Sequence, residues 1–292
     1  MYYGSIEAGG TKFVCAVGNK ELQILEKVSF PTTNPEETMK HVFEFFDNYF
    51  LSAIGIGSFG PIDIDPNSNT YGYITNTPKL LWRNFDFLGV VKERYSIPVA
   101  WTTDVNAAAY GEYWDGAGKG KESCLYLTIG TGIGGGFVRH NELFQGRTHP
   151  EMGHIMIKMH PDDKEKGICP SHGSCLEGLA SGYAIEQRYQ QSAKSIDKDH
   201  EIWTFEAYYL AQALWNYTLT LTPDVIILGG GVMKQDHLIE KVRHELEAIN
   251  NDYITLPNLK DYIVLPALGD EPATMGCLRL AQEALQNQSA QR

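Results

Sequence analysis

A chain of 292 residues, 43% of them hydrophobic and 21% charged, is long enough for one large or two mid-sized globular domains with a substantial core. Its 24 basic and 36 acidic residues leave a net charge of −12, which disfavours nucleic acids and anionic membranes as partners. No apolar run approaches the roughly 20 residues that span a bilayer, and no basic segment precedes an apolar one at the N-terminus. We therefore expect a cytoplasmic protein that binds neither nucleic acid nor membrane.

The first part of the chain alternates strands with helices. Apolar alternation broken by glycines predicts three strands joined by tight turns, over 2–7, 13–17 and 22–28. A helix is expected to begin at Pro35, capped by Asn34, and to run through the region 42–50. The next elements are a strand over 53–58, a helix over 88–95 and a strand over 99–103. This alternation indicates an α/β sheet.

The apolar pattern stops around 116–122, where we place a domain boundary. Beyond it, an irregular stretch over 149–175 separates regular elements. Strands are predicted over 124–129, 136–139, 225–228 and 263–267, and helices over 176–191, 205–222, 238–248 and 273–286. We therefore expect an N-terminal domain over 1–115, onto which the helix 273–292 packs back, and a larger C-terminal domain over 116–272.

Both halves open with a strand, a turn of glycine and threonine, and a strand that returns, which predicts two similar lobes facing each other across a cleft. Glycines in such turns permit positive φ and let backbone N–H groups approach an anion closely. The 130–135 turn matches the G-x-G-x-x-G pattern of dinucleotide-binding proteins, but that pattern needs a strand leading into a helix, and 136–139 continues as a strand. The predicted phosphate-binding residues are Gly9, Gly10, Thr11, Lys12, Thr131 and Gly132.

Two further motifs follow predicted strands. Gly229, Gly230 and Gly231 come directly after a buried strand, where missing side chains would let a nucleoside lie on the backbone; a loose loop is the alternative. Asp104 stands at the end of a strand and the start of an alanine-rich helix. It is either the N-cap of that helix or a catalytic acid at the carboxyl end of the sheet, where α/β proteins bind ligands.

A C-x₂-H-x₂-C motif, formed by Cys169, His172 and Cys175, predicts a metal site. One upstream histidine would complete a tetrahedral Cys₂His₂ set for Zn²⁺, and we expect His154. By spacing alone, two other histidines compete for this place: His149 and His160. A closed set of four ligands indicates a structural zinc, which would order the zinc loop 154–175. The other three of the five cysteines lie in apolar segments and are expected to be core thiols: Cys15, Cys124 and Cys277.

The order of these motifs resembles that of the ROK family of sugar kinases and repressors along nearly the whole chain. The zinc loop is similar to that of the bacterial fructokinases in this family, because His172 replaces a thiolate that most of its sugar kinases carry. The matching segments are 7–12, 104–109, 130–136, 151–154, 169–182 and 229–231.

The resemblance implies an α/β fold of two actin/hexokinase-like (ribonuclease H-like) lobes around a cleft, with ATP and Mg²⁺ in the cleft. It implies transfer of the γ-phosphoryl group to the 6-hydroxyl of a hexose, most simply fructose, with glucose or mannose as alternatives. Asp104 would be the general base. The residues that would bind sugar hydroxyls are Asn106, Glu151, His154 and Glu177. His154 would then serve both the zinc and the sugar, and we expect the enzyme to be a homodimer.

Two positions depart from the usual family pattern. Most members have aspartate at the position of Glu7, but the fructokinase branch has glutamate there, as this chain does. Thr103 stands where most members have asparagine. The second departure removes one expected contact to the sugar or the base. A sugar-sensing repressor is an alternative, although such regulators carry an N-terminal helix-turn-helix domain and the first predicted strand here begins at Tyr2. A zinc-dependent hydrolase is a third, which the closed ligand set disfavours.

Overall fold

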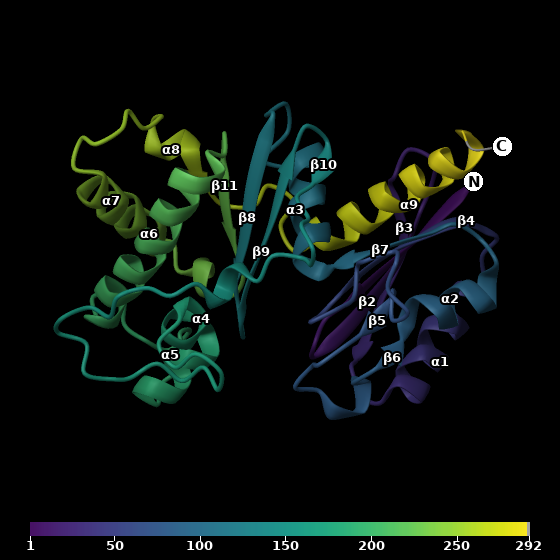
Figure 1. Ribbon diagram of the computed structural model, residues 1–292, viewed down its shortest axis with the longest axis horizontal. Coiled ribbons are helices and arrows are strands. Elements are labelled where there is room, and N and C mark those ends of the chain that lie inside the picture. Colours follow the sequence, from purple (N-terminus) through teal and green to yellow (C-terminus); the bar gives the residue numbers. More distant parts are fainter. Residues whose placement is uncertain (291–292) are drawn as a thin grey trace. The chain divides into compact units, whose positions relative to one another are not determined.

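The computed structural model describes residues 1–290, and the chain forms two compact units. Unit 1 comprises Met1–Gly116, Leu143–Pro150 and the chain from Leu268 onward. Unit 2 comprises Ala117–Glu142 and Glu151–Ala267. Each unit is built on one five-stranded sheet (Figure 1).

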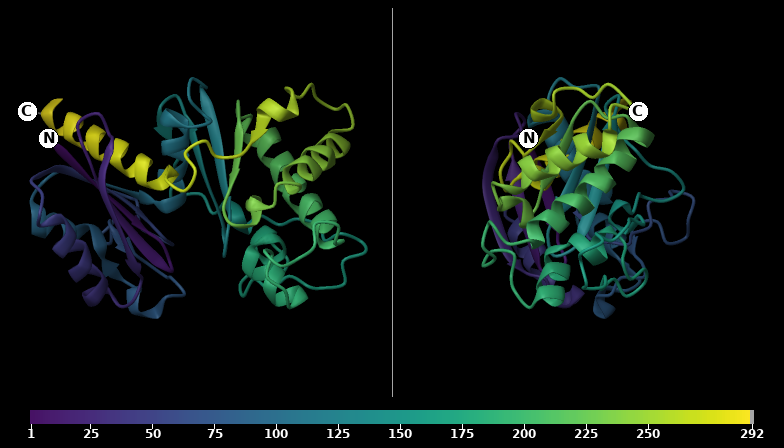
Figure 2. Two further views of the ribbon diagram at one scale, coloured as in Figure 1. Left: turned by 180° about the vertical axis from the view of Figure 1, so that it is seen from behind. Right: turned by 90° about the vertical axis from the view of Figure 1, so that its left-hand side faces the viewer.

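The sheet of unit 1 has the strand order β3-β2-β1-β4-β7. Strand β1 pairs antiparallel with β2 and parallel with β4, and β4 pairs parallel with β7. The strands are β1 (Tyr2–Ala8), β2 (Lys12–Gly18), β3 (Ile24–Pro31), β4 (Leu51–Ser58) and β7 (Val99–Thr103). The helices are α1 (Pro35–Phe46), α2 (Phe87–Tyr95), α3 (Asp104–Asp115) and α9 (Pro272–Ala290). Helices α1 and α2 pack against one face, and α9 runs along the other, as both Figure 1 and Figure 2 show.

Local sequence explains where α1 begins. The Asn34 side chain accepts a hydrogen bond from the Glu37 backbone N–H (2.9 Å), and Pro35 occupies the first helical turn, as predicted. The helix ends at Phe46, whereas the sequence pattern predicts a helix through 42–50. The pattern misleads because Phe50 is not a core residue but is 97% exposed just before β4.

The sheet of unit 2 repeats this topology, with the order β10-β9-β8-β11-β12. Strands β8 and β9 form an antiparallel hairpin, and β8 pairs parallel with β11. The shared order confirms the internal repeat that the two glycine turns predict. The strands are β8 (Ser123–Ile129), β9 (Ile133–Arg139), β10 (Glu142–Leu143), β11 (Ile226–Gly229) and β12 (Ile263–Val264). The helices are α4 (Leu176–Ala180), α5 (Gly182–Tyr189), α6 (Ile202–Leu221), α7 (Leu238–Asn250) and α8 (Leu259–Tyr262).

Several elements differ from the sequence-based expectation. The helix predicted over 176–191 is broken at Ser181, whose backbone is extended and whose hydroxyl caps α5 by accepting from the Ala184 N–H (3.0 Å). The strand predicted over 263–267 has only two paired residues. The sequence pattern also missed short elements that depend on tertiary contacts: β5 (Tyr73–Ile74), β6 (Phe85–Asp86), β10, α8, and the 3₁₀ turns η1 (Leu80–Trp82), η2 (Met152–His154) and η3 (Val232–Lys234).

The three cysteines outside the metal motif are fully buried, as expected for core thiols. Burial raises the pKa of both Cys15 and Cys277 far above the usual thiol range. They therefore stay protonated in the core. Among the residues that the structure describes, no helix is long and apolar enough to cross a membrane.

Glycines set the distance between α3, α9 and β4. A Cβ on Gly276 would lie 1.8 Å from the Ala107 carbonyl oxygen, and one on Gly111 would lie 2.1 Å from the Pro272 carbonyl oxygen. On β4, a Cβ at Gly57 would come within 3.2 Å of the Asp104 Cα atom. The helix that begins at Asp104 thus rests directly on backbone.

We expect Gly276→Ala to lower the free energy of unfolding by about 1–3 kcal/mol, because the added methyl group forces α9 away from α3. Urea denaturation followed by circular dichroism measures this change. Gly146→Ala is the matched control in the same unit, since a Cβ there meets nothing within 4 Å. Equal stability of the two variants would contradict the close packing.

Candidate active site and metal centre

The first glycine turn, Gly9–Thr11, connects β1 to β2. The Gly9 N–H donates to the Lys12 carbonyl oxygen (3.0 Å), and the Thr32 hydroxyl donates to the Gly9 carbonyl oxygen (2.7 Å). A Cβ on Gly9 would lie 2.8 Å from that Lys12 oxygen, so the turn requires glycine there. Thr11 and Lys12 are exposed, which leaves their hydroxyl and ammonium groups accessible to a ligand.

Glu7 lies just before this turn. Its carboxylate accepts a hydrogen bond from the Thr274 hydroxyl (3.2 Å). Burial raises the pKa of Glu7, and the Thr274 hydrogen bond and the charge of Lys12 act in the opposite direction. Glu7 is therefore a partly buried acid near the end of β1, directly before the turn.

Asp104 is the first residue of α3, at the carboxyl end of β7. Its carboxylate accepts from the adjacent Val105 N–H (2.9 Å), and it is partly exposed. The N-cap is Thr103, whose hydroxyl accepts from the Asn106 N–H (3.1 Å). The N-cap interpretation of Asp104 is therefore wrong, and Thr103 caps the helix. The Asp104 carboxylate also lies at the positive end of the helix dipole, where an anion is stabilised.

Asn106 is fully buried beneath this helix start. Its amide nitrogen donates to the Thr102 hydroxyl (3.1 Å), and its carbonyl oxygen has no hydrogen-bond partner among the residues that the structure describes. A buried acceptor without a partner costs free energy and marks a place where a further donor would bind. Contact of Asn106 with a sugar hydroxyl stays a prediction.

The second glycine turn, Gly130–Gly132, joins β8 to β9 in unit 2. Because β9 pairs antiparallel with β8 along its whole length, the G-x-G-x-x-G segment leads into a strand, as predicted, and not into a helix. Thr131 is exposed at the tip, and the Gly182 N–H at the start of α5 donates to the Gly130 carbonyl oxygen (2.7 Å). Gly132 is not among the glycines with positive φ.

Gly229 is the last residue of β11 and Gly230 and Gly231 follow it, and each glycine has its own surroundings. A Cβ on Gly229 would lie 2.4 Å from the Tyr126 hydroxyl, and Gly230 has φ +90° and packs against the Ile129 backbone. A Cβ on Gly231 would meet nothing within 4 Å, and this residue is exposed. Packing therefore explains the first two glycines, and Gly231 presents open backbone on which a flat ligand could lie.

The structure brings together the four predicted metal ligands: His154, Cys169, His172 and Cys175. One ligand atom from each lies within 4.8 Å of the others. The His154 Nδ1 atom is 3.8 Å from the Cys169 Sγ atom and 3.6 Å from the Cys175 Sγ atom, and the His172 Nδ1 atom is 3.7 Å from the Cys169 Sγ atom. A tetrahedron with zinc–ligand bonds of about 2.0–2.3 Å has edges of roughly 3.3–3.8 Å, so the donor set fits zinc.

Burial raises the pKa of the Cys175 thiol to about 11. His172 is the exposed member of the four predicted ligands.

The two histidines that compete with His154 by spacing lie elsewhere. The His149 Nε2 atom accepts from the Ile62 N–H (3.2 Å) in unit 1, and the His160 Nδ1 atom accepts from the Asp162 N–H (3.2 Å). Of the three histidines, His154 is the one that lies beside Cys169, His172 and Cys175, which spacing alone could not decide.

His154 also faces a carboxylate. Its Nε2 atom is 3.8 Å from the Glu177 Oε1 atom, while its Nδ1 atom points to the thiols. The other Glu177 oxygen, Oε2, accepts from the Ile133 N–H (2.9 Å) at the start of β9. Three predicted site residues, His154, Glu177 and Gly132, are therefore neighbours in unit 2. Glu151 is exposed one residue before η2.

A buried ion pair that sequence reasoning missed anchors the middle of the zinc loop. Asp163 accepts hydrogen bonds from Arg188 on α5 and from the hydroxyls of Tyr209 (2.6 Å) and Tyr189 (2.9 Å). Arg188 also donates to the Leu179 carbonyl oxygen (2.7 Å). This network holds the loop in addition to the predicted metal, and the ordering of the loop by zinc stays a prediction. No sequence signal pairs Asp163 with a residue 25 positions away.

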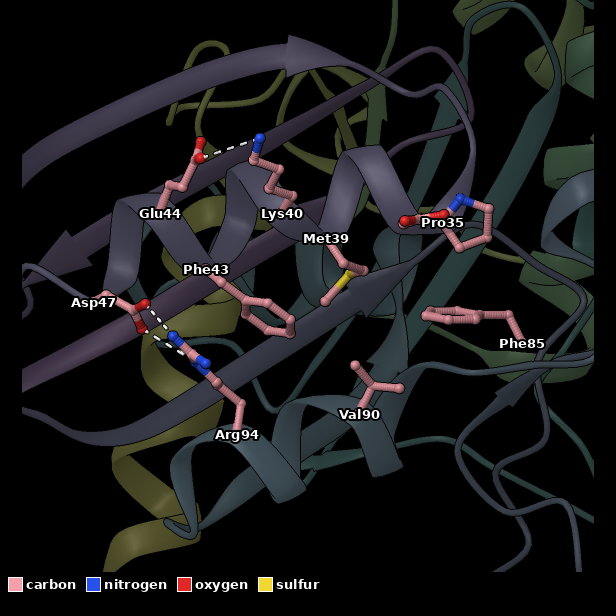
Figure 3. A pocket seen from close by; sticks show the side chains of 10 residues that line it. Pro35, Met39, Lys40, Phe43, Glu44, Asp47, Phe85, Val90 and Arg94 are labelled. Carbon is pink, nitrogen blue, oxygen red and sulfur yellow. Dashed lines mark hydrogen bonds and ion pairs between the residues drawn. The ribbon is translucent and has the colours of Figure 1, made fainter.

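A groove of about 600 Å³ lies between α1 and α2 in unit 1 (Figure 3). Its apolar part is formed by Pro35, Met39, Phe43, Phe85 and Val90. Two ion pairs border it, between Arg94 and Asp47 and between Lys40 and Glu44 (Figure 3). None of the predicted catalytic, phosphate-binding or metal-binding residues lines this groove, so it is separate from the candidate site.

The fold and the order of the motifs can be compared with those of known proteins. The solved glucokinase from Streptomyces griseus, a ROK family protein in complex with glucose and AMPPNP, shares the fold with a TM-score of 0.74 and 25% sequence identity, over 97% of this chain and 99% of that one. The chain belongs to the ROK family, whose model matches residues 3–284.

Two relatives are more similar in sequence. A fructokinase from Streptococcus mutans is 49% identical over 287 residues, covering 96% of this chain and 97% of the relative. A fructokinase from Pediococcus pentosaceus is 48% identical over 287 residues, covering 98% of this chain and the whole of the relative. The match to both extends over nearly the full length of each chain.

Proposed function

We propose that this member of the ROK family is an ATP-dependent fructokinase, which converts D-fructose and ATP to D-fructose 6-phosphate and ADP. The observation that carries the proposal is the near-full-length identity of 49% and 48% to two fructokinases. The glucokinase solved with glucose and AMPPNP, an analogue of ATP, is only 25% identical and supports a hexose and a nucleotide as the ligand classes. Glucokinase or mannokinase activity is the alternative.

Phosphoryl transfer requires from the protein mainly positioning and charge neutralisation. We assign Asp104 as the general base that accepts the proton of the fructose 6-hydroxyl as this oxygen attacks the γ-phosphorus atom. Its position at the N-terminus of α3, beyond the carboxyl end of β7, supports this role. Thr103 caps the helix and so holds Asp104 in place. Glu151, His154 and Glu177 are assigned to the sugar hydroxyls, and Asn106 is kept as a further sugar ligand.

The phosphates of ATP are assigned to the two glycine turns. Thr11 and Lys12 supply a hydroxyl and a charge from the first turn, and Thr131 and Gly132 supply a hydroxyl and a backbone N–H from the second. Gly231 offers open backbone for the nucleoside, beside Gly229 and Gly230. Mg²⁺ supplies charge neutralisation at the β- and γ-phosphates when bound.

Zn²⁺ is the metal that the Cys₂His₂ set fits best, because two thiolates and two imidazoles at tetrahedral spacing disfavour Mg²⁺. His154, Cys169, His172 and Cys175 would hold it, and no ligand position stays open for a reacting water. Such a zinc site is structural and orients His154 toward the sugar. We also expect a cytoplasmic homodimer, on the composition and the family resemblance.

The function is tested by measuring ADP release with ATP and Mg²⁺ over fructose, mannose, glucose and N-acetylated hexoses. We expect kcat/KM to be highest for fructose. A higher kcat/KM for glucose would make the protein a glucokinase, and no hexose-dependent ADP release would contradict the kinase assignment.

Gly10→Val should raise the KM for ATP roughly 10–100-fold, because a side chain at this position keeps phosphate from the backbone N–H groups of the turn. The fold should tolerate the change, since Gly10 has no positive φ and its Cβ would meet only the flexible end of Lys79, at 3.1 Å. Steady-state kinetics with ATP varied, together with the melting temperature, measure both effects. An unchanged KM for ATP in the folded variant would remove this turn from the nucleotide site.

A further inference from the structure

Ile133, the first residue of β9, is held at both of its backbone groups by the segments that carry the metal ligands. The Ile133 N–H donates to Glu177 Oε2 (2.9 Å), two residues beyond Cys175. On the other side, a Cβ on Gly153 would lie 1.9 Å from the Ile133 carbonyl oxygen, one residue before His154. The end of the Gly130–Gly132 turn is thus packed between the segment before His154 and the segment after Cys175.

Glu177 joins these parts through its two carboxylate oxygens. Oε2 accepts the hydrogen bond from Ile133, and Oε1 lies 3.8 Å from the Nε2 atom of His154, whose Nδ1 atom faces the thiols. A Cβ on Gly132 would lie 2.6 Å from Glu177 Oε2, so the carboxylate also sits directly against the glycine turn. The chain of contacts runs from the thiols through His154 and Glu177 to the turn.

We propose that Glu177 is a positioning residue that couples the Cys/His metal centre to the phosphate-binding turn Gly130–Gly132, so that metal occupancy sets the affinity for ATP as well as for the sugar. This inference rests on the proposed function, since it takes the turn to be a phosphate site. A role of Glu177 in sugar binding alone leaves its hydrogen bond to Ile133 unexplained.

The physical reason is preorganisation. A turn whose N–H groups are already aimed at the phosphates loses little conformational freedom when ATP binds. Ile133 is buried, so loss of Glu177 leaves its N–H donor without this partner and releases the end of the turn. Loss of the metal frees His154 and removes the group that faces Glu177 Oε1.

Charge opposes this effect and can be separated from it. A carboxylate beside the turn repels phosphate, so a purely electrostatic role predicts tighter nucleotide binding when the charge is removed. Glu177→Gln removes the charge but keeps an oxygen that accepts from Ile133, whereas Glu177→Ala removes both. The exposed Glu186 on α5 provides the matched control, as Glu186→Ala removes one charge from the same unit.

The test measures binding of AMPPNP with Mg²⁺ by calorimetry, without sugar. The samples are the metal-loaded wild type, the three metal-loaded variants, and both the wild type and Glu177→Ala after a chelator has removed the metal. We expect Glu177→Ala and metal stripping each to weaken binding by about tenfold, and stripping of Glu177→Ala to add little. Glu177→Gln should bind AMPPNP at least as tightly as the wild type, because it keeps the acceptor for Ile133 and loses the repelling charge. Glu186→Ala should bind nearly as the wild type does.

Hydrogen exchange gives a readout that does not depend on activity. The amide of Ile133, followed in a peptide over 127–135, should exchange at least about tenfold faster in Glu177→Ala than in the wild type or Glu177→Gln. If circular dichroism shows that the chelator unfolds the protein, the AMPPNP affinity and the hydrogen exchange of metal-loaded Glu177→Ala provide the test.

Unchanged AMPPNP affinity in Glu177→Ala, or tighter binding in both Glu177 variants, would overturn the coupling while leaving the kinase assignment intact. Additive effects of stripping and Glu177→Ala would show that the metal acts by another route and would overturn it as well. Failure of the wild type to bind AMPPNP would instead remove the proposed function, and the coupling with it.

Discussion

Asp104→Asn is expected to lower kcat for fructose phosphorylation by about 10²–10⁴, because the amide cannot accept the proton of the attacking hydroxyl. Binding of fructose should change little, since the substitution keeps the size of the side chain and an oxygen to accept from the Val105 N–H. Single-turnover kinetics and calorimetry with fructose measure the two quantities separately.

The control for this variant is Asp65→Asn, which changes an exposed turn aspartate in the same unit and should leave kcat unaltered. Retention of more than about half of the wild-type kcat in Asp104→Asn would show that another group is the base. A large loss of fructose affinity with kcat preserved would make Asp104 a sugar ligand only.

Cys169→Ser should abolish zinc binding, which we expect at one ion per chain in the wild type. Removing one thiolate leaves three ligands, and hydroxyl oxygen is a poor donor for zinc at neutral pH. Proteolysis should then cut within 166–174, where most of the other hydrogen bonds join residues of the same short segment. The part around Asp163 should stay protected by Arg188 and Tyr209. Elemental analysis and limited proteolysis measure both effects.

The matched control is Cys124→Ala, which removes a buried thiol from β8 and should leave the zinc content at one per chain. Full activity of a wild-type preparation that contains no zinc would contradict the proposed zinc site. Uniform proteolysis of the whole loop in Cys169→Ser would contradict the independent anchor at Asp163.

The parts of this protein that sequence could predict are those fixed by local chemistry. The hairpin turns at 9–11 and 130–132, the Asn34 cap and the C-x₂-H-x₂-C motif depend on residues a few positions apart, and the structure has each of them. Local chemistry was not enough at Asp104, for which the sequence offers the N-cap of α3 as one of two roles. The backbone geometry places the Thr103 hydroxyl on the Asn106 N–H, so the cap is Thr103 instead.

The rest depends on contacts between distant segments. The choice of His154 over His149 and His160 follows from η2 packing on Ile133, which needs Gly153, and from the hydrogen bond that occupies His149. The clamp of Glu177 on Ile133 joins residues 44 positions apart, and the groove between α1 and α2 exists only once both helices pack on the sheet. Periodicity and motif spacing carry no information on such contacts.

The most direct test of the account is the identity of the product formed from fructose labelled with ¹³C and ATP. Nuclear magnetic resonance should show one fructose 6-phosphate for each ADP, with phosphorus coupling at carbon 6, and no product with Asp104→Asn. Phosphate on carbon 1, or ADP formed without any sugar phosphate, would contradict the central claim that the chain transfers a phosphoryl group from ATP to the 6-hydroxyl of fructose.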